Sequence, residues 1–312
     1  MFIKKYVCGF GVFCLLPISI FADEHVAHTN EVEISYVSLS ADPDINGLEY
    51  DVNGYAVDVT HYLQPVSIDG SVPYYEASFV QHTPHIGIGY SSYDLTYRRN
   101  EVSLLKRNQD SPNFNILYVF DGTPFTLYLE IQKINIDNTL GDVPLTLYST
   151  NSKVDATLLG AGYFLQKTTF LSLFVAQGDR DSSFSDSTTL HSDISYYSGY
   201  FRHLALLENQ QALAVLLDYA KETHKDDGDG KTKYTSYSAD VTFYVDPKIG
   251  LAFGYSANNS DEASNESHTM HLGYRQFLNK NLSLSLEYAK DSADHPQGND
   301  TTRYGVKFTG MF

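Results

Sequence analysis

The final stretch of the chain, 302–312, alternates between apolar and polar side chains. Strand side chains alternate with period two, so an extended chain places every second residue on the same face. One face carries Tyr304, Val306, Phe308, Gly310 and Phe312, and the other carries Arg303, Gly305, Lys307 and Thr309. Such a strand suits a wall with an apolar medium on one side and water on the other. The rest of the chain must supply the other strands of that wall.

The apolar face includes the last residue, Phe312, and no polar tail follows it. This ending resembles the terminal signature of Gram-negative outer-membrane β-barrel proteins. The resemblance implies an all-β fold, a transmembrane antiparallel up-and-down β-barrel surrounded by lipid in the bacterial cell outer membrane. It also implies that the barrel assembly machinery reads the terminal strand as an assembly signal, through Tyr304, Val306, Phe308 and Phe312. Backbone groups in hydrocarbon have no water to bond, so the sheet must close, and we expect the last strand to pair with the one near Val32.

A leader precedes the strands. Two lysines are followed by the apolar run 6–21 and by the small residue Ala22. A charged start, an apolar middle and a small cleavage residue are the parts of a secretory signal peptide. A single transmembrane helix is the alternative, but it needs ~20 apolar residues, and glycine and proline interrupt this shorter run. We therefore expect 1–22 to be cleaved and 23–312 to form a single transmembrane β-barrel domain.

Cysteine and charge content narrow the sites and partners open to the chain. Both cysteines, Cys8 and Cys14, lie in the leader, so the exported protein would have no disulfide and no thiolate metal site. The formal net charge is −17, from 21 Lys and Arg against 38 Asp and Glu. This balance excludes a nucleic-acid partner, because phosphate binding needs a basic surface. Runs of about 18 apolar residues, which helical membrane proteins need, do not follow the leader.

Alternating segments recur along the chain. We count about fourteen strands, an even number that returns both ends to the same rim, with about twelve or sixteen as alternatives. The doubtful segments are 101–107 and 143–148, and the sequence at 63–66 predicts a turn. Strands of about nine to eleven residues would cross a hydrocarbon layer at a tilt.

The connections between these segments fall into two groups. In the second half of the chain, short turns alternate with longer hydrophilic stretches such as 177–192 and 222–232. Transmembrane barrels have short periplasmic turns and longer extracellular loops, and we expect that arrangement here. A soluble β-sandwich is the structural alternative, which alternation alone does not exclude.

One motif carries a second resemblance. Tyr62, Pro65 and Val66 are followed by a Pro-Tyr-x-Glu-Ala-x-Phe segment, whose residues are Pro73, Tyr74, Glu76, Ala77 and Phe79. This pattern resembles the general bacterial porin family, the Gram-negative outer-membrane β-barrel porins, in which the segment leads into the next strand. Val80 stands where that family prefers Leu. The resemblance implies a channel.

The inward positions of the predicted strands carry charged and polar residues. Such a lining is too polar to be a packed core, so we expect it to hold water. The expected pore-lining residues are Glu33, Asp58, Glu130, Asp218, Asp240, Arg275, Glu287 and Lys307. The stretch 93–109 reads as either an extended hairpin or a loop, and if it folds inward its basic residues would form a constriction. These candidates are Arg98, Arg99, Lys106 and Arg107.

These features together predict an outer-membrane porin, a water-filled channel for the passive diffusion of small hydrophilic solutes and ions. The acidic excess of the lining predicts weak cation selectivity. The residues do not decide the solute, nor the choice between a monomer and a homotrimer.

Two other functional classes fit a barrel. An outer-membrane enzyme of the lipase or protease type needs residues that act together. The nearest fragments are Asp42-Pro43-Asp44, Asp294-His295 and His191-Ser192. All three stand in predicted loops without partners at matching spacing, so we expect no catalytic site. A structural or adhesive barrel would bind a partner through its loops, whose composition is ordinary. We also expect no cofactor and no metal site, because strand alternation separates His268 from His271.

Overall fold

The computed structural model describes residues 26–41, 48–68, 70–99, 102–140, 150–184, 189–226, 230–261, 266–293 and 300–312. The expected signal peptide, 1–22, and the doubtful segment 143–148 lie outside these residues. Within them, no helix has both the length and the apolar content to cross a membrane.

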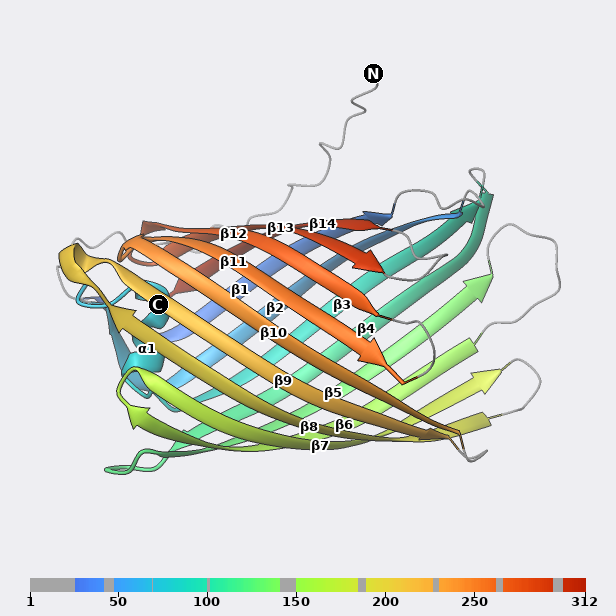
Figure 1. The fold of residues 1–312 in the computed structure, drawn as a ribbon, viewed down its shortest axis with the longest axis horizontal. Coiled ribbons are helices and arrows are strands. Elements are labelled where there is room, and N and C mark those ends of the chain that lie inside the picture. Colours follow the sequence, from blue (N-terminus) through green and yellow to red (C-terminus); the bar gives the residue numbers. More distant parts are fainter. Residues whose placement is uncertain are drawn as a thin grey trace, which may run out of the picture.

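The described residues contain fourteen strands, which form one closed antiparallel barrel (Figure 1). Each strand pairs with its neighbours in sequence, and the ring closes where β1 pairs with β14. The strands are β1 (Val26–Ala41), β2 (Leu48–Ile68), β3 (His85–Arg99), β4 (Val102–Val119), β5 (Phe125–Leu140), β6 (Thr150–Gln166), β7 (Thr169–Phe184), β8 (Thr189–Leu206), β9 (Ala212–Asp226), β10 (Lys231–Asp246), β11 (Ile249–Ser260), β12 (Ser267–Asn279), β13 (Leu282–Ala293) and β14 (Thr301–Met311). The predicted fold class and strand number are confirmed.

The seam between the first and last strands is as predicted. Val32 is opposite Gly310 in the β1–β14 ladder. Past the end of β14, the amide N–H of Phe312 donates to the carbonyl of Asn30 at 2.9 Å, and the Asn30 N–H donates back at 2.8 Å. The C-terminal residue therefore extends the ladder that closes the barrel.

The two faces of the wall differ in the way that the alternation predicts. In β13, Leu286 and Tyr288 are exposed on the outer face, whereas Glu287 between them points inward and pairs with Arg303. Other large apolar side chains exposed on the outer face include Ile34, Tyr55, Val57, Ile88, Leu127, Leu159, Leu173, Phe253 and Leu272. The wall thus has its apolar face outside and its charged face inside.

The two rims carry different connections. The short-turn rim holds Phe312 and tight turns such as 120–124, 167–168 and 247–248. Gly122, in the first of these turns, has a φ of 68°, a left-handed conformation that favours glycine. At the opposite rim, called the long-loop rim, successive strand ends are farther apart in sequence, as between the end of β5 at Leu140 and the start of β6 at Thr150.

Two strand predictions are wrong in detail. The predicted turn at 63–66 lies inside β2, where Pro65 falls in the register break between the pairs His28–Val66 and Asn30–His61. Proline has no amide proton to donate to a neighbouring strand, so it is tolerated at such a bulge. β14, with 11 residues, has the expected length, but the other strands are longer, up to 21 residues in β2. Polar segments predicted as loops, such as 177–184, continue the ladder, because backbone pairing does not need apolar side chains.

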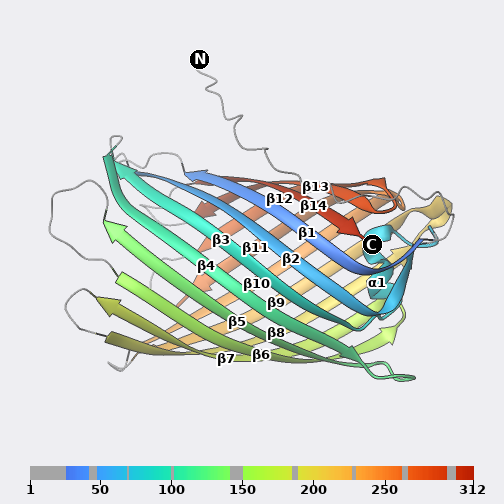
Figure 2. The same ribbon diagram turned by 180° about the vertical axis from the view of Figure 1, so that it is seen from behind.

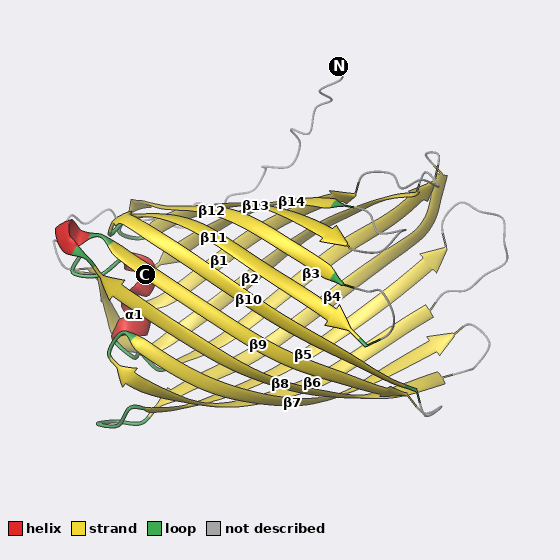
Figure 3. Cartoon of the chain, in the orientation of Figure 1, coloured by secondary structure: helices red, strands yellow, loops and turns green. Residues whose placement is uncertain are grey.

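The connection between β2 and β3 folds into the barrel. We call residues 70–84 the plug segment; it contains the turn η1 (Tyr74–Glu76) and the short helix α1 (Ala77–Val80). Figures 1 and 3 show α1 at the short-turn rim among the barrel strands, and Figure 2 shows the same end from behind. Buried clusters form where this segment meets the wall, one of them made of Ile68, Tyr74, Phe277 and Met311. The packed core of the protein therefore includes the contact between plug segment and wall.

Candidate functional site

Glu76 ties the plug segment to the far side of the barrel. Its side chain is buried, and its carboxylate accepts hydrogen bonds from the Arg202 guanidinium at 2.5 Å and the Tyr244 hydroxyl at 2.7 Å. Arg202 lies on β8 and Tyr244 on β10, across the ring from β2 and β3. The segment must therefore cross the bore to make both contacts. Removing one partner of such a buried ion pair typically costs about 3–5 kcal/mol.

Aromatic side chains fix the two ends of the plug segment. Tyr74 and Tyr75 pack edge-on against Phe277 of β12, with ring centroids 5.0 and 4.6 Å apart. At the helical end, the ring centroids of Phe79 and of Phe164 on β6 are 5.7 Å apart. The Arg202 guanidinium also lies over the Phe79 ring, 4.2 Å from its centroid. The aromatic ring thus shields the ion pair from water. Cation–π contacts are stronger where water is excluded.

The plug segment returns to the wall at Gln81 and His82. The Gln81 side chain forms two hydrogen bonds with the backbone of Ser67, at 2.9 and 2.7 Å. His82 has a φ of 51°, an uncommon conformation for a non-glycine residue. Its ring stacks on Phe164 at 3.5 Å, and its Nε2 lies 3.1 Å from the Lys167 carbonyl. Burial lowers the pKa of His82 below its ordinary value of 6.5.

The motif that carried the porin resemblance lies largely in this plug. The resemblance implied a segment that leads into the next strand, and the structure shows that it first crosses the bore. Tyr62 and Val66 of β2 form a buried cluster with Ala77 of α1. A signal was present in the sequence, because Pro73 to Phe79 is too rich in large apolar residues for an exposed turn.

Small cavities lie on two sides of the plug segment. One, of about 180 Å³, lies between α1 and the inner faces of β4 to β8 and is lined by Phe79, Phe164 and Phe170 among others. The other, of about 170 Å³, lies against β1, β12 and β14 and has charged residues in its lining. We call the second the polar cavity. The plug segment thus has an aromatic space on one side and a charged space on the other.

The residues predicted to line a pore lie on the inward face, and several of them are paired there. The Lys307 ammonium lies 2.9 Å from a Glu33 oxygen, and His271 lies 2.7 Å from Asp240. Glu287 pairs with Arg303 at 3.0 Å. Glu130 accepts a hydrogen bond from the Tyr128 hydroxyl at 2.7 Å, and Asp58 stands opposite Glu33 in the ladder. Asp218 and Arg275 occupy inward positions on β9 and β12. Their contact with a permeating solute stays a prediction.

Sequence reasoning missed the arginines that balance this lining. Arg202 and Arg303 both point inward and both hold a carboxylate. Arg303 was placed on the polar face of its strand but was not counted in the lining. Arg202 stands among the apolar residues of β8, where its sequence position gives no sign of a buried partner from another part of the chain.

The four basic residues proposed for a constriction lie in the wall. They belong to the β3–β4 hairpin, which continues as a regular ladder to the long-loop rim. Arg98 pairs on the outer face with Asp51 at 2.5 Å, and Lys106 shares that face. Arg107 points inward, and its Nε donates to Asn138 at 2.7 Å. Arg99 also falls on the inward face by alternation, so two of the candidates remain beside the bore.

A group of ligand-type side chains lies on the outer face near the long-loop rim. One atom from each of Asp179, His191 and Asp193 lies within 4.8 Å of the others. His191 already lies 2.8 Å from Asp181. Exposed acidic groups of this kind are common without a cation.

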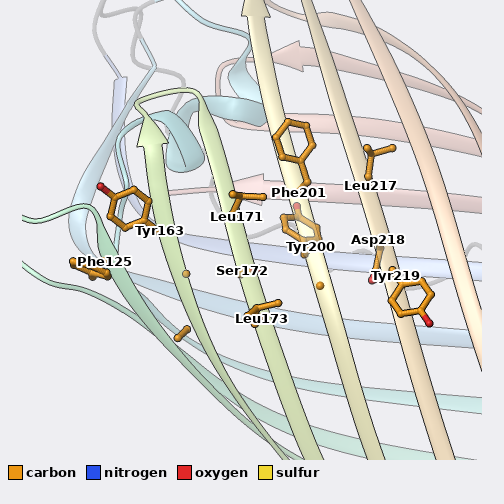
Figure 4. Close-up of a pocket in the computed structure, with 13 residues that line it drawn as sticks. Phe125, Tyr163, Leu171, Ser172, Leu173, Tyr200, Phe201, Leu217, Asp218 and Tyr219 are labelled. Atoms are coloured by element: carbon orange, nitrogen blue, oxygen red, sulfur yellow. The ribbon is translucent and has the colours of Figure 1, made fainter.

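The outer face of β5 to β9 has a shallow apolar hollow of about 550 Å³ (Figure 4). Small residues at Ala161 and Gly199 form its floor, and bulky side chains surround them. Figure 4 shows Leu171, Leu173, Phe201, Leu217 and Tyr219 on neighbouring strands around it. This hollow belongs to the apolar outer surface and is separate from the bore.

No family model matches the sequence, and no curated protein matches it. The resemblance to the general bacterial porin family therefore stays a prediction.

Solved structures share the fold at low sequence identity. The outer membrane protein Omp33 of Acinetobacter baumannii is 12% identical with a TM-score of 0.53, and the match covers 92% of this chain and 99% of that one. The Pseudomonas putida toluene transporter TodX is 10% identical with a TM-score of 0.54, covering 91% and 90%. A Pseudomonas aeruginosa FadL homologue is 10% identical with a TM-score of 0.51, covering 93% and 91%. All three are similar in barrel architecture.

Proposed function

We propose that this protein is an outer-membrane porin, a channel through which small hydrophilic solutes and ions diffuse passively, and that the plug segment limits its opening. The proposal rests on the polarity of the barrel wall, which is the reverse of that of a water-soluble protein. Leu272 and its apolar neighbours lie on the outer face, and ion pairs such as Glu33–Lys307 lie on the inner face. Water would satisfy the inner face and hydrocarbon the outer face. The outer hollow at Ala161 and Gly199 would then receive lipid chains.

The orientation follows from the connections. The short-turn rim, with the plug segment and Phe312, would face the periplasm, and the long-loop rim would face the exterior. The channel would therefore be narrowed at its periplasmic end.

The character of the bore decides the class of solute. TodX, similar in fold, is named as a toluene transporter. The bore here carries ion pairs such as Asp240–His271 and Glu287–Arg303. Charged groups lose hydration when an apolar solute displaces water from them. This cost favours hydrophilic solutes over hydrocarbons, and the proposal includes no catalytic step.

Liposome swelling tests the proposal. Purified protein in phospholipid vesicles is diluted into isosmotic solutions of a monosaccharide, a disaccharide and a tetrasaccharide. We expect swelling to be faster than in empty vesicles and to slow as the sugar grows. A variant with residues 74–79 replaced by glycine and serine should swell faster still. Failure of both proteins to admit the monosaccharide, although each migrates as a folded barrel, would rule out a diffusion channel.

A further inference from the structure

We propose that the polar cavity binds a small zwitterion of the α-amino acid class, with its carboxylate at Arg275 and its ammonium at Glu31. This inference rests on the proposed channel function and adds a solute class to it. The cavity lies between the plug segment and wall residues of β1, β2, β12 and β14.

Among the described residues, one basic and one acidic side chain of the cavity have no ionic partner. Glu33 and Lys307 also line it, but they neutralise each other at 2.9 Å. Arg275 forms no ion pair with any described residue, and its guanidinium lies over the Tyr75 ring at 5.6 Å. Glu31 likewise forms no ion pair among the described residues; it accepts a hydrogen bond from the Tyr62 hydroxyl at 3.1 Å and shares a further side-chain hydrogen bond with Glu33.

This charge arrangement selects against ions of a single sign. An anion at Arg275 would meet two carboxylates in the same cavity, and a cation at Glu31 would meet two basic groups. A zwitterion satisfies Arg275 and Glu31 together. Hydrogen bonds to charged groups are about twice as strong as neutral ones, and screening by water is weaker between wall and plug than in the open bore.

A third polar group in the cavity lacks a partner. His28 lines the cavity and is 3% exposed, and its Nδ1 has no hydrogen-bond partner in the part of the chain that the structure describes. Buried polar atoms are almost always hydrogen-bonded, since leaving one unpaired costs free energy. A ligand with both donors and acceptors would satisfy this nitrogen in either tautomer.

The size of the cavity limits the solute. Its volume is about 170 Å³, whereas pockets for drug-sized ligands start at about 300 Å³. A volume this small suits a ligand of about the size of alanine. A longer side chain would have to displace Tyr75 or Ser78 of the plug segment.

Saturation-transfer NMR on the purified full-length barrel in detergent tests the site without requiring conduction. The probes are L-alanine, propionate and ethylamine, which are similar in size. Alanine carries both a carboxylate and an ammonium group, propionate only a carboxylate and ethylamine only an ammonium group. We expect alanine to bind at least about tenfold more tightly than either single ion, because each of those lacks one charge-assisted contact. Equal signals from all three probes would overturn the proposal.

Matched variants locate the binding. Arg275→Gln and Glu31→Gln should each weaken alanine binding by about tenfold or more. The control is Arg303→Gln with Glu287→Gln, which removes an inward ion pair that does not line the cavity and should leave binding unchanged. Every variant is first checked for the heat-dependent gel shift of a folded barrel. Alanine binding that survives both cavity variants contradicts the assignment.

Swelling assays on the same preparations separate the two proposals. If sugars enter the vesicles but alanine does not bind more tightly than the single ions, the channel proposal is supported and the proposed binding site is contradicted. Alanine binding without flux through wild-type or unplugged protein leaves the site standing and removes the channel.

Discussion

The carboxylate of Glu76 meets the guanidinium of Arg202 at 2.5 Å, although the two residues are attached to opposite sides of the barrel ring. The contact holds a short apolar segment across a bore that otherwise carries charged side chains. Tyr244 adds a second hydrogen bond to the same carboxylate. The position of the plug segment is therefore set by specific buried polar contacts as well as by packing.

Adjacent residues on β12 test the two faces of the wall. Leu272 is exposed on the outer face, and His271 points inward to Asp240. Leu272→Arg should destabilise the barrel by about 2–4 kcal/mol if the residue lies near the membrane midplane. His271→Arg is the control, since arginine can retain the contact with Asp240. Urea unfolding in lipid vesicles measures both, and equal losses would contradict an outer face in lipid.

The terminal residue tests how the barrel assembles. Deleting Phe312 removes a few backbone hydrogen bonds at the seam with Asn30 and about 2 kcal/mol of apolar burial. We expect a larger effect in cells, with little protein reaching the outer membrane, if the assembly machinery reads this end. Phe312→Tyr, which keeps an aromatic end, should assemble normally. Wild-type amounts of the deleted form in outer-membrane fractions would count against this prediction.

Much of the barrel was predictable because period-two patterning and ladder closure follow from local sequence. The outward residues of β14 and the seam at Val32 were both predicted correctly. The ends of strands were not, since polar segments such as 177–184 satisfy their backbone in a ladder as readily as in a loop. The turn predicted at Pro65 was wrong because a break in the strand register accommodates the proline.

The apolar content of the plug segment was visible in the sequence, but its path across the bore was not predictable from local patterning. Its position depends on Arg202 and Tyr244, which lie more than a hundred residues away in sequence from Glu76. Alternation assigns a side chain to a face of the wall, but it does not reveal which connection crosses the bore. The inward Arg303 was visible in the pattern, and its pairing with Glu287 needed the register.

Ion selectivity tests the charge of the bore. We expect a weak cation preference, measured as a reversal potential under a salt gradient, that declines as salt shortens the screening length to below about 10 Å. Neutralising Glu130, Asp240 and Glu287 should remove or reverse it, since this also frees the cation Arg303. An anion preference in the wild type would mean that the inward arginines dominate.

The pH dependence of plug docking tests His82. Because burial lowers its pKa, the docked state favours the neutral ring. This contribution is complete above pH 6.5 and is lost as the pH falls through the lowered pKa. A Ser78→Cys reporter should therefore react faster with maleimide below pH 6.5, relative to the same reporter with His82→Phe at each pH. Identical profiles for the two proteins would show that His82 does not hold the plug.

Single-channel conductance in planar bilayers tests the central claim, that the bore conducts and the plug segment limits it. The comparison is between wild type, Glu76→Gln and the control Glu208→Gln, an exposed carboxylate in the turn η2 (Glu208–Gln210) at the same rim. Glu76→Gln leaves Arg202 without its carboxylate, which weakens docking by about 3–5 kcal/mol. We predict larger or longer openings for Glu76→Gln and wild-type steps for Glu208→Gln. Conductance that is absent from all three, or identical in all three, would contradict the claim.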